Sequence, residues 1–432
     1  MPASWQPMMD FRRRLHQREH VAGDQDQVAT RDGVPENREE GHRQAHEVLI
    51  LEWDQGWAVR CPPRWRIAAA GSKAMRLKGS DWRVVGGMLA CLAAGACADG
   101  EEAGTPLSGS SGEARAAAAT ITEADFLDRV AILAHDSMRG RATPSPEIEE
   151  AARWIAGELA AMGLEPGGGG GGFIQRYSFR PRFVDVEAPA IDAPNVVAVL
   201  TGSDLALRNE YVVFSAHMDH VGVREPDASG DSVYNGADDD ASGTAAVIEI
   251  AEAFAALEEP PPRSTVFLLV SGEERGLHGS RAYADDPPEP VASGRMVANL
   301  NMDMVGRNWP DTIVAIGKEH SDLGATLERV NAAHPELGMT AIDDLWPDEN
   351  FYFRSDHYNF ARNGVPVLFF FNGTHDDYHR PSDEVELIDA GKGARLTRLI
   401  FYLGLEIASA PEPPEWNPAS RRMIVEMIES RP

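Results

Sequence analysis

The sequence predicts an α/β fold, a three-layer α/β/α sandwich around a mixed, mostly parallel central sheet. Short apolar runs with strand composition alternate along the chain with longer segments whose apolar residues recur at helical spacing. One strand-like run, residues 264–270, is almost continuously apolar, which is typical of a strand covered by helices on both faces. Strands that alternate with helices favour a layered α/β arrangement.

The expected elements follow one another from residue 121 onward. Thr122 is a suitable N-cap for the first helix, with Asp125 three residues later, and Gly163 is a suitable stop for the second. No phosphate-loop lysine follows the glycine run at 167–172, so we expect a flexible loop there. We expect helices over residues 121–135, 147–162, 243–257, 277–283, 323–333 and 391–410. We expect strands over residues 173–179, 195–200, 211–216, 264–270, 296–302, 312–316 and 365–371.

Composition limits the partners and the ligand types. The chain has 432 residues and a formal net charge of -28, which argues against nucleic acid and anionic membranes as partners. Its length allows one large α/β domain with additional segments. All three cysteines, Cys61, Cys91 and Cys97, precede residue 100, so any metal in the main domain must be held by His, Asp and Glu.

The first 97 residues read as two segments. Residues 1–74 show no sustained apolar period, which indicates disorder or a stretch upstream of the true start. Residues 75–97 resemble a secretory leader, with basic residues first, an apolar run over 84–96 and small residues before Cys97. The cysteine directly after small residues predicts a lipoprotein, whose only membrane contact is a lipid anchor on Cys97. We therefore expect export, to the periplasm or cell envelope, or secretion.

The rest of the chain divides into three parts. Residues 98–120 are mostly Gly, Ser, Ala and Glu, the composition of a flexible tether. Residues 121–410 carry the alternating elements and form the expected catalytic domain. Residues 411–432 begin with prolines and are expected to form a C-terminal tail.

Polar clusters follow four of the predicted strands. His217-Met218-Asp219 follows 211–216, Ser271-Gly272-Glu273-Glu274 follows 264–270, Asp303 follows 296–302, and His375-Asp376-Asp377-Tyr378-His379 follows 365–371. In open α/β sheets, ligands bind at the carboxyl ends of strands. One such cluster is often a solvated loop, but four at four strand ends indicate a site.

A fifth cluster, Asn235 to Gly243, reads NGADDDASG and leads into a predicted buried helix. Three adjacent carboxylates, Asp238, Asp239 and Asp240, repel one another beside a buried helix unless a positive partner is present. A metal ion is the simplest such partner, and His217 is expected to lie within reach of it.

The motif order H-x-D, GADDDASG, GEE, MD and DYH resembles the M28 family of zinc metallopeptidases, which includes bacterial di-zinc aminopeptidases. The resemblance runs from about residue 121 to 405 and includes the segment HDSMRGR at 135–141. It implies two zinc ions per chain and a cis peptide bond after the middle aspartate. The implied metal ligands are His217 and Asp303 for one ion, Glu274 and His379 for the other, and Asp239 as the bridge between them.

The resemblance also implies catalytic roles. Glu273 would be the general base, Asp219 would orient His217, and Tyr378 would stabilise the oxyanion, with a packing role as the alternative for this tyrosine. Glu273 and Glu274 cannot both face the site from a regular strand, so we expect an irregular strand end, which Gly272 permits.

The remaining polar residues are assigned more loosely. Ser355-Asp356-His357 resembles a family motif near the substrate pocket, so Asp356 and His357 are candidate substrate contacts. A structural hydrogen bond is the alternative role for His357. We expect His220 and His278 to lie behind the metal ligands or at the surface.

The leading hypothesis is a zinc exopeptidase that removes N-terminal residues from peptides. Two alternatives are enzymes of other activity on the same fold. One is a glutaminyl cyclase-like single-zinc acyltransferase, and the other is a carboxypeptidase or dipeptidase. The M20 type carries a long inserted lid domain, for which residues 275–302 leave no room. A non-catalytic binding module is the third alternative. The complete set of five ligands argues against this module and against the cyclase.

Overall fold

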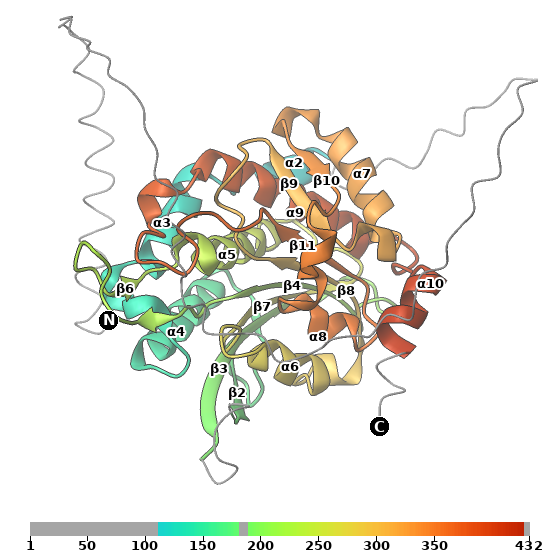
Figure 1. Cartoon of the computed structure of the whole chain (residues 1–432). Coiled ribbons are helices and arrows are strands. Elements are labelled where there is room, and N and C mark those ends of the chain that lie inside the picture. The colour runs from blue at the N-terminus through green and yellow to red at the C-terminus, as the bar shows by residue number, and fades with distance from the viewer. Residues whose placement is uncertain (1–110, 181–188, 427–432) are drawn as a thin grey trace, which may run out of the picture. The chain divides into compact units, whose positions relative to one another are not determined.

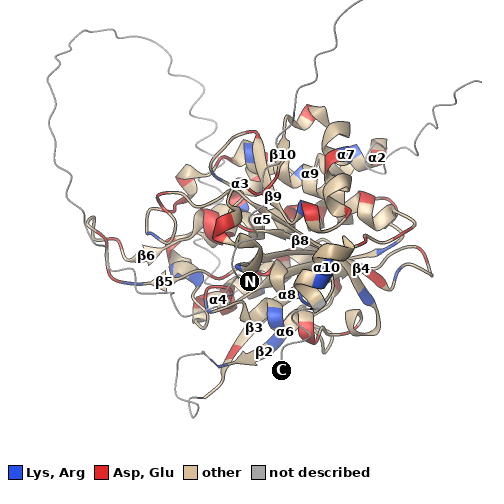
Figure 2. Ribbon diagram, turned by 45° about the vertical axis from the view of Figure 1, so that its right-hand side comes forward, with Lys and Arg blue, Asp and Glu red and all other residues tan. Residues whose placement is uncertain are grey.

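The computed structural model describes residues 111–180 and 189–426. The predicted segments 1–74 and 75–97, including Cys97, lie outside the described residues. Within the described part of the chain, no helix is long and apolar enough to span a membrane. Figure 2 shows Asp and Glu interspersed with Lys and Arg around the described ribbon.

A nine-stranded mixed sheet forms the centre of the fold, in the order β1-β3-β7-β4-β8-β11-β9-β10, with β2 paired to β3. The four strands β7, β4, β8 and β11 are mutually parallel, and the pairs β3–β7 and β11–β9 that flank them are antiparallel. The strands are β1 (Glu165–Pro166), β2 (Ile174–Phe179), β3 (Ile191–Leu200), β4 (Glu210–His217), β7 (Ser264–Val270), β8 (Arg295–Met302), β9 (Thr312–Ile316), β10 (Thr340–Ile342) and β11 (Val367–Phe371). A separate hairpin joins β5 (Gly222–Val223) to β6 (Val233–Tyr234).

Helices cover both faces of the sheet, so the predicted three-layer sandwich is confirmed (Figure 1). Side chains of β3 alternate between two apolar cores, Val196 and Ala198 in one and Val197 and Val199 in the other, as strand geometry requires. The first core includes α3 (Glu123–Leu133), α4 (Pro146–Ala161), α5 (Gly243–Ala255), α7 (Leu323–Ala333) and α9 (Ala390–Ser409). The second includes α6 (His278–Asp285) and α8 (His357–Ala361).

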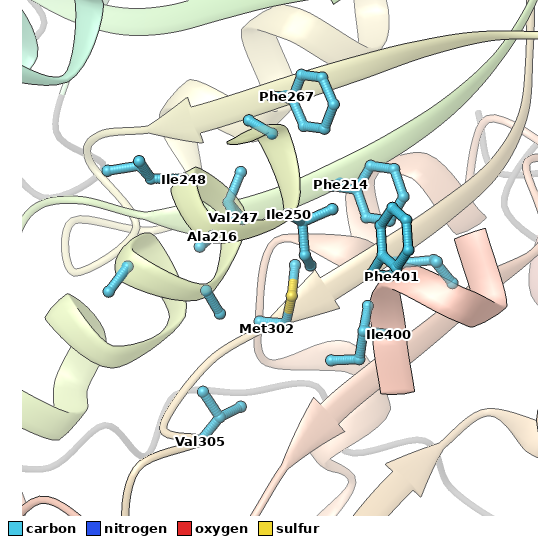
Figure 3. Close-up of a cluster of buried hydrophobic side chains, with 14 of the residues drawn as sticks. Phe214, Ala216, Val247, Ile248, Ile250, Phe267, Met302, Val305, Ile400 and Phe401 are labelled. Carbon is cyan, nitrogen blue, oxygen red and sulfur yellow. The ribbon is translucent and has the colours of Figure 1, made fainter. Parts of the chain in front are cut away.

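The helix α9 packs closely against α5 and β4 through an aromatic cluster (Figure 3). Phe254 lies 5.1 Å from Phe401 and 5.4 Å from Phe214 between ring centroids. A side chain at Gly404 would meet the Phe214 ring at 2.2 Å, so only glycine allows this approach. This packing holds the C-terminal end of α5, the helix that follows the three aspartates.

Two segments differ from their sequence predictions. The tether predicted over 98–120 contains α2 (Gly112–Ala118), which Ser111 caps and whose Ala114, Ala117 and Ala118 are buried in the core. Small apolar side chains repeated on one helical face were misread as linker composition.

The expected tail at 411–432 is also packed over its described part. The Trp416 indole Nε1 donates a hydrogen bond to the Gly364 carbonyl at 2.8 Å. The short helix α10 (Pro418–Arg421) follows, and Ile424 and Val425 are buried in the second core. The fold thus continues beyond residue 410.

Candidate metal centre

The site lies at the carboxyl ends of the parallel strands, as predicted from the sequence. His217 is the last residue of β4, Glu273 and Glu274 follow β7, Asp303 follows β8, and His379 lies in the loop after β11. Because β7, β4, β8 and β11 are adjacent and parallel, their carboxyl ends meet at one edge of the sheet. This topology brings together residues that are up to 162 positions apart in the sequence, from His217 to His379.

Asp239 is at the centre of the site. Its Oδ1 lies 3.3 Å from His217 Nε2, and its Oδ2 lies 3.1 Å from His379 Nε2. One carboxylate therefore faces two histidines with opposite oxygens, the arrangement of a bridging ligand. The peptide bond between Asp239 and Asp240 is cis, as the resemblance implied.

A first group of potential ligands lies on the Oδ1 side of Asp239. The Asp303 Oδ1 atom is 3.6 Å from His217 Nε2, and Glu273 belongs to the same group. The Ser355 hydroxyl donates a hydrogen bond to the other Asp303 oxygen at 2.9 Å and so orients this carboxylate.

A second group lies on the Oδ2 side and includes a residue that sequence reasoning missed. Glu274 Oε1 lies 3.2 Å from His379 Nε2 and 2.9 Å from His220 Nδ1, and His220 Nδ1 lies 3.6 Å from Asp239 Oδ2. His220 is buried beside Asp239 and Glu274, so of the two expected positions the one at the surface is wrong. Strand alternation places His217 and His220 on opposite sides, but β4 ends at His217, and beyond that point the alternation no longer applies.

The two neighbours of Asp239 have other partners. Asp240 accepts hydrogen bonds from the backbone amides of His217 at 3.1 Å and Gly243 at 2.9 Å. Asp238 accepts from the Gly306 amide at 2.6 Å. The structure thus separates the three adjacent carboxylates into two that tie backbone segments together and one, Asp239, that lies between His217 and His379.

The relation between Asp219 and His217 differs in detail from the prediction. His217 Nδ1 contacts the main-chain carbonyl of Asp219 at 3.1 Å, whereas the carboxylate oxygen is 3.8 Å away. The Asp219 carboxylate instead accepts hydrogen bonds from the Thr143 hydroxyl at 3.0 Å and the Glu273 amide at 3.3 Å. Asp219 therefore orients His217 through its carbonyl and holds the backbone of Glu273 through its side chain.

The end of β7 has the irregularity that the glutamate pair requires. Gly272 has a φ of +72°, and a side chain there would meet the Tyr177 hydroxyl at 2.7 Å. After this turn Glu273 belongs to the first group and Glu274 to the second. Burial raises the pKa of Glu273 well above its usual value, although His217 opposes this shift.

Arg141 connects the loop after β4 to the loop that precedes the three aspartates. Its guanidinium is buried and donates hydrogen bonds to the carbonyls of Met218 at 2.9 Å, Asn235 at 2.8 Å and Gly236 at 3.1 Å, and also to Leu133. Burial lowers the pKa of Arg141 to about 10, and nearby carboxylates, with Asp219 the strongest, oppose this shift. Arg141 is the last residue of the HDSMRGR segment, which explains how this segment contributes to the site.

A cleft of about 410 Å³ opens onto the first group. Tyr378 lines it, and its ring stacks on His379 with centroids 3.9 Å apart. The full lining comprises His217, Asp239, Glu273, Asp303, Met304, Phe351, Arg354, Ser355, Phe369, Phe371, Thr374, Tyr378 and His379.

Asp356 and His357 do not line this cleft, which corrects their predicted role as substrate contacts. His357 Nε2 contacts the Tyr352 carbonyl at 2.8 Å, its ring stacks on Phe369, and burial lowers its pKa to about 3. The alternative structural hydrogen bond is therefore the one observed. The Asp356 side chain is also fully buried, one residue before α8 begins.

Comparison with known proteins shows a family to which this part of the chain is similar. The model of peptidase family M28 matches residues 195–404. A probable zinc metalloprotease of Pyrenophora teres f. teres is 28% identical over 315 residues, which covers 62% of this chain and 62% of that protein. Leucine aminopeptidase 1 of Uncinocarpus reesii is 29% identical over 231 residues, covering 50% of this chain and 55% of that protein. The chain thus spans about 62% of the length of the curated relative with the longer match.

Solved structures share the fold. LapB from Legionella pneumophila is 19% identical with a TM-score of 0.55, and the match covers 71% of this chain and 77% of LapB. BSAP, a zinc aminopeptidase from Bacillus subtilis, is 14% identical with a TM-score of 0.51, and the match covers 66% of this chain and 94% of BSAP. All the metal-facing residues described above lie within residues 195–404, the part of the chain that the model of peptidase family M28 matches.

Proposed function

We propose that the protein is a zinc-dependent exopeptidase that removes N-terminal residues from peptides with two metal ions. The observation that carries the proposal is the position of Asp239, whose two oxygens face two separate groups of His, Asp and Glu side chains. The family match and the zinc aminopeptidase with the same fold support the activity.

The residues present fit a pair of cations. Both ring nitrogens of His220, Asp239 Oδ2 and Glu274 Oε1 are buried, and none has a hydrogen bond of acceptable geometry within the described residues. Buried polar atoms are rarely left in this state. Three carboxylates and three imidazoles suit zinc. Two zinc ions carry four positive charges and the carboxylates carry three negative charges, so one bound hydroxide would make the site neutral.

His217, Asp303 and Asp239 would hold one ion, and Asp239, Glu274, His379 and His220 would hold the other. Four of the six distances among the ligand atoms of the second set are 2.9, 3.1, 3.2 and 3.6 Å in the structure. A tetrahedron with metal–ligand bonds of about 2.0–2.1 Å has edges of about 3.3 Å. The agreement between these distances and the tetrahedral edge supports His220 Nδ1 as a fourth protein ligand, one more than the sequence predicted for this ion.

Glu273 would act as the general base. When bound, the two zinc ions would lower the pKa of water and polarise the scissile carbonyl. Glu273 would take the proton from that water and deliver it to the leaving amine. The Tyr378 hydroxyl would donate a hydrogen bond to the oxyanion. Asp219 would keep Glu273 in place through its hydrogen bond to the Glu273 amide.

The cleft also supports a preference for apolar residues at the cleavage site. Met304, Phe351, Phe369 and Phe371 form its apolar lining. Burial of an apolar side chain against these residues would stabilise the bound peptide in proportion to the area removed from water.

The test is an assay of amino-acid p-nitroanilides and their N-terminally blocked analogues, with metal removal and restoration. We expect hydrolysis of leucine p-nitroanilide, no hydrolysis of the acetylated compound, loss of activity after chelation and recovery with zinc. Activity that survives chelation would contradict the metal mechanism. Cleavage of an N-acetylated dipeptide with a free C-terminus, such as N-acetyl-Leu-Gly, without cleavage of leucine p-nitroanilide would favour the carboxypeptidase alternative. One zinc per chain would favour the cyclase.

We also propose that the protein is exported through residues 75–97 and anchored by lipid on Cys97. The arrangement of basic residues, apolar run and small residues before the cysteine supports this. Mass spectrometry of the protein from its native host should find a modified N-terminal Cys97. An intact Met1 would contradict both export and anchoring.

A further inference from the structure

The cleft contains one permanently positive side chain. Among the cleft-lining residues, all of which the structure describes, Arg354 is the only lysine or arginine, and it shares the lining with Asp239, Glu273 and Asp303. The chain as a whole carries a formal net charge of -28. Such a chain repels anions, so a positive group in the substrate cleft calls for an explanation.

The guanidinium of Arg354 is available to a ligand. Its Nη1 donates a long hydrogen bond to the Glu349 carbonyl at 3.5 Å and lies 3.8 Å from Oε2 of the Glu349 carboxylate, and the two side chains are 52% and 63% exposed. Exposed ion pairs of this kind contribute about 0–1 kcal/mol. A substrate carboxylate can therefore replace Glu349 with little loss of free energy.

Arg354 is also held at a fixed place relative to the metal centre. Its guanidinium lies over the Phe351 ring, 4.7 Å from the centroid, and Phe351 itself lines the cleft. The next residue, Ser355, donates its hydroxyl to Asp303 at 2.9 Å. One peptide unit thus connects the arginine to a residue that contacts a proposed zinc ligand.

We propose that Arg354 binds a carboxylate of the substrate, specifically the free C-terminal carboxylate of a short peptide whose N-terminal residue is cleaved at the metal centre. The inference rests on the proposed exopeptidase function and narrows it to short peptides with a free C-terminal carboxylate, because Arg354 lines the same cleft as Asp239, Glu273 and Asp303. The planar guanidinium can hold a carboxylate through two parallel hydrogen bonds.

The experiment compares Arg354→Gln with the wild type on matched substrates: Leu-Gly, Leu-Gly-amide and leucine p-nitroanilide. We expect Arg354→Gln to raise KM for Leu-Gly by about 10- to 100-fold, the range for loss of a hydrogen bond to a charged group. KM for Leu-Gly-amide and leucine p-nitroanilide should stay within about twofold of wild type. Arg354→Lys should recover part of the loss. Arg329→Gln, which removes an exposed arginine on α7, is the matched control for the change in charge.

Two further arms separate the possible outcomes. Leu-Glu-amide tests whether the carboxylate comes from an acidic side chain, and preference for it over Leu-Gly would overturn the C-terminal assignment. Calorimetric binding of Leu-Gly to Glu273→Gln, with and without Arg354→Gln, measures recognition without turnover. If the wild type hydrolyses none of these substrates but Leu-Gly binding still depends on Arg354, the exopeptidase function is overturned and carboxylate recognition is retained. Hydrolysis of Leu-Gly and Leu-Gly-amide that is indifferent to Arg354 would overturn this inference alone.

Discussion

At the scale of single residues, the candidate metal centre depends on three adjacent aspartates that have different roles. Asp240 accepts hydrogen bonds from the amides of His217 and Gly243, and Asp238 accepts from Gly306. Asp383 in turn accepts from the amides of Asp238 and Asp239, both at 3.1 Å. These contacts fix the backbone of Asp239 from both sides and leave its carboxylate to face the histidines.

The first residue-scale prediction concerns His220. If His220 is a ligand, His220→Ala should weaken zinc at the second site by more than about 100-fold, because loss of an outer-shell partner alone typically lowers metal affinity by about 10–100-fold. Equilibrium dialysis with zinc measures the affinity. The absorption spectrum of the cobalt-substituted protein should also change, because one imidazole leaves the coordination shell. Unchanged affinity and spectrum would show that His220 is a buried bystander.

The second residue-scale prediction concerns Glu273. Glu273→Gln should lower kcat by about 10²–10⁴-fold, the usual contribution of a positioned acid–base group, while the zinc content stays at the wild-type level. The pair of measurements separates proton transfer from metal binding. Glu274→Gln is the matched comparison and should lose metal from the second site. Wild-type turnover by Glu273→Gln would exclude it as the general base.

At the scale of elements, Arg141 joins the end of β4 to the loop that precedes the aspartates. Its guanidinium donates hydrogen bonds to the carbonyl of Met218, next to His217, and to the carbonyls of Asn235 and Gly236, shortly before the aspartates. The segment that contains Arg141 therefore has a structural role in positioning the ligands, and it contributes no side chain to the cleft.

Arg141→Met should lower the free energy of unfolding by on the order of 3–5 kcal/mol, because it leaves several buried carbonyls without a donor. Urea unfolding of the chelated protein measures this effect without a contribution from zinc. Arg139→Met, two residues away, is the control. That side chain is 58% exposed and its guanidinium lies 3.6 Å from Glu147, so the change should be within about 0.5 kcal/mol. Equal effects of the two substitutions would contradict the role of Arg141.

The start of α9 offers a prediction about pH. Lys392 is fully buried, and its ammonium donates to the Arg307 carbonyl. Burial lowers the pKa of Lys392 from 10.5 to about 8, although Asp238 and Asp389 oppose this shift. Between pH 8 and 10.5 the unfolded chain binds this proton and the folded chain does not. The contribution of Lys392 to stability therefore becomes more favourable as pH rises, by up to about 3 kcal/mol.

Lys392→Met should remove this rise. The difference in unfolding free energy between wild type and Lys392→Met should move in favour of wild type from pH 7.5 to pH 10, measured by urea unfolding at each pH. Arg395→Met, on the same helix, should leave the pH dependence of the wild type unchanged. A constant difference between wild type and Lys392→Met would contradict the lowered pKa.

At the scale of the whole molecule, apolar periodicity in the sequence predicted the strands and helices, and the polar residues at strand ends predicted the position of the site. The apolar run at 264–270 and the polar residues after it gave the position of Glu273 and Glu274 at the sheet edge. His220 was missed because strand alternation ceases to apply after His217, and only the folded turn brings its ring back to Asp239. The helix α2 was missed because a run of alanines has linker composition until a core is available to bury it.

The central claim is that side chains from four strand ends and the start of α5 converge on two cations that share Asp239. Anomalous X-ray scattering at the zinc absorption edge, from crystals of the zinc-loaded protein, tests it most directly. The account predicts two peaks per chain about 3.5–4 Å apart, one in contact with His217 and Asp303 and the other with Glu274 and His379, both bound to Asp239. A single peak, or two peaks that do not share Asp239, would contradict it.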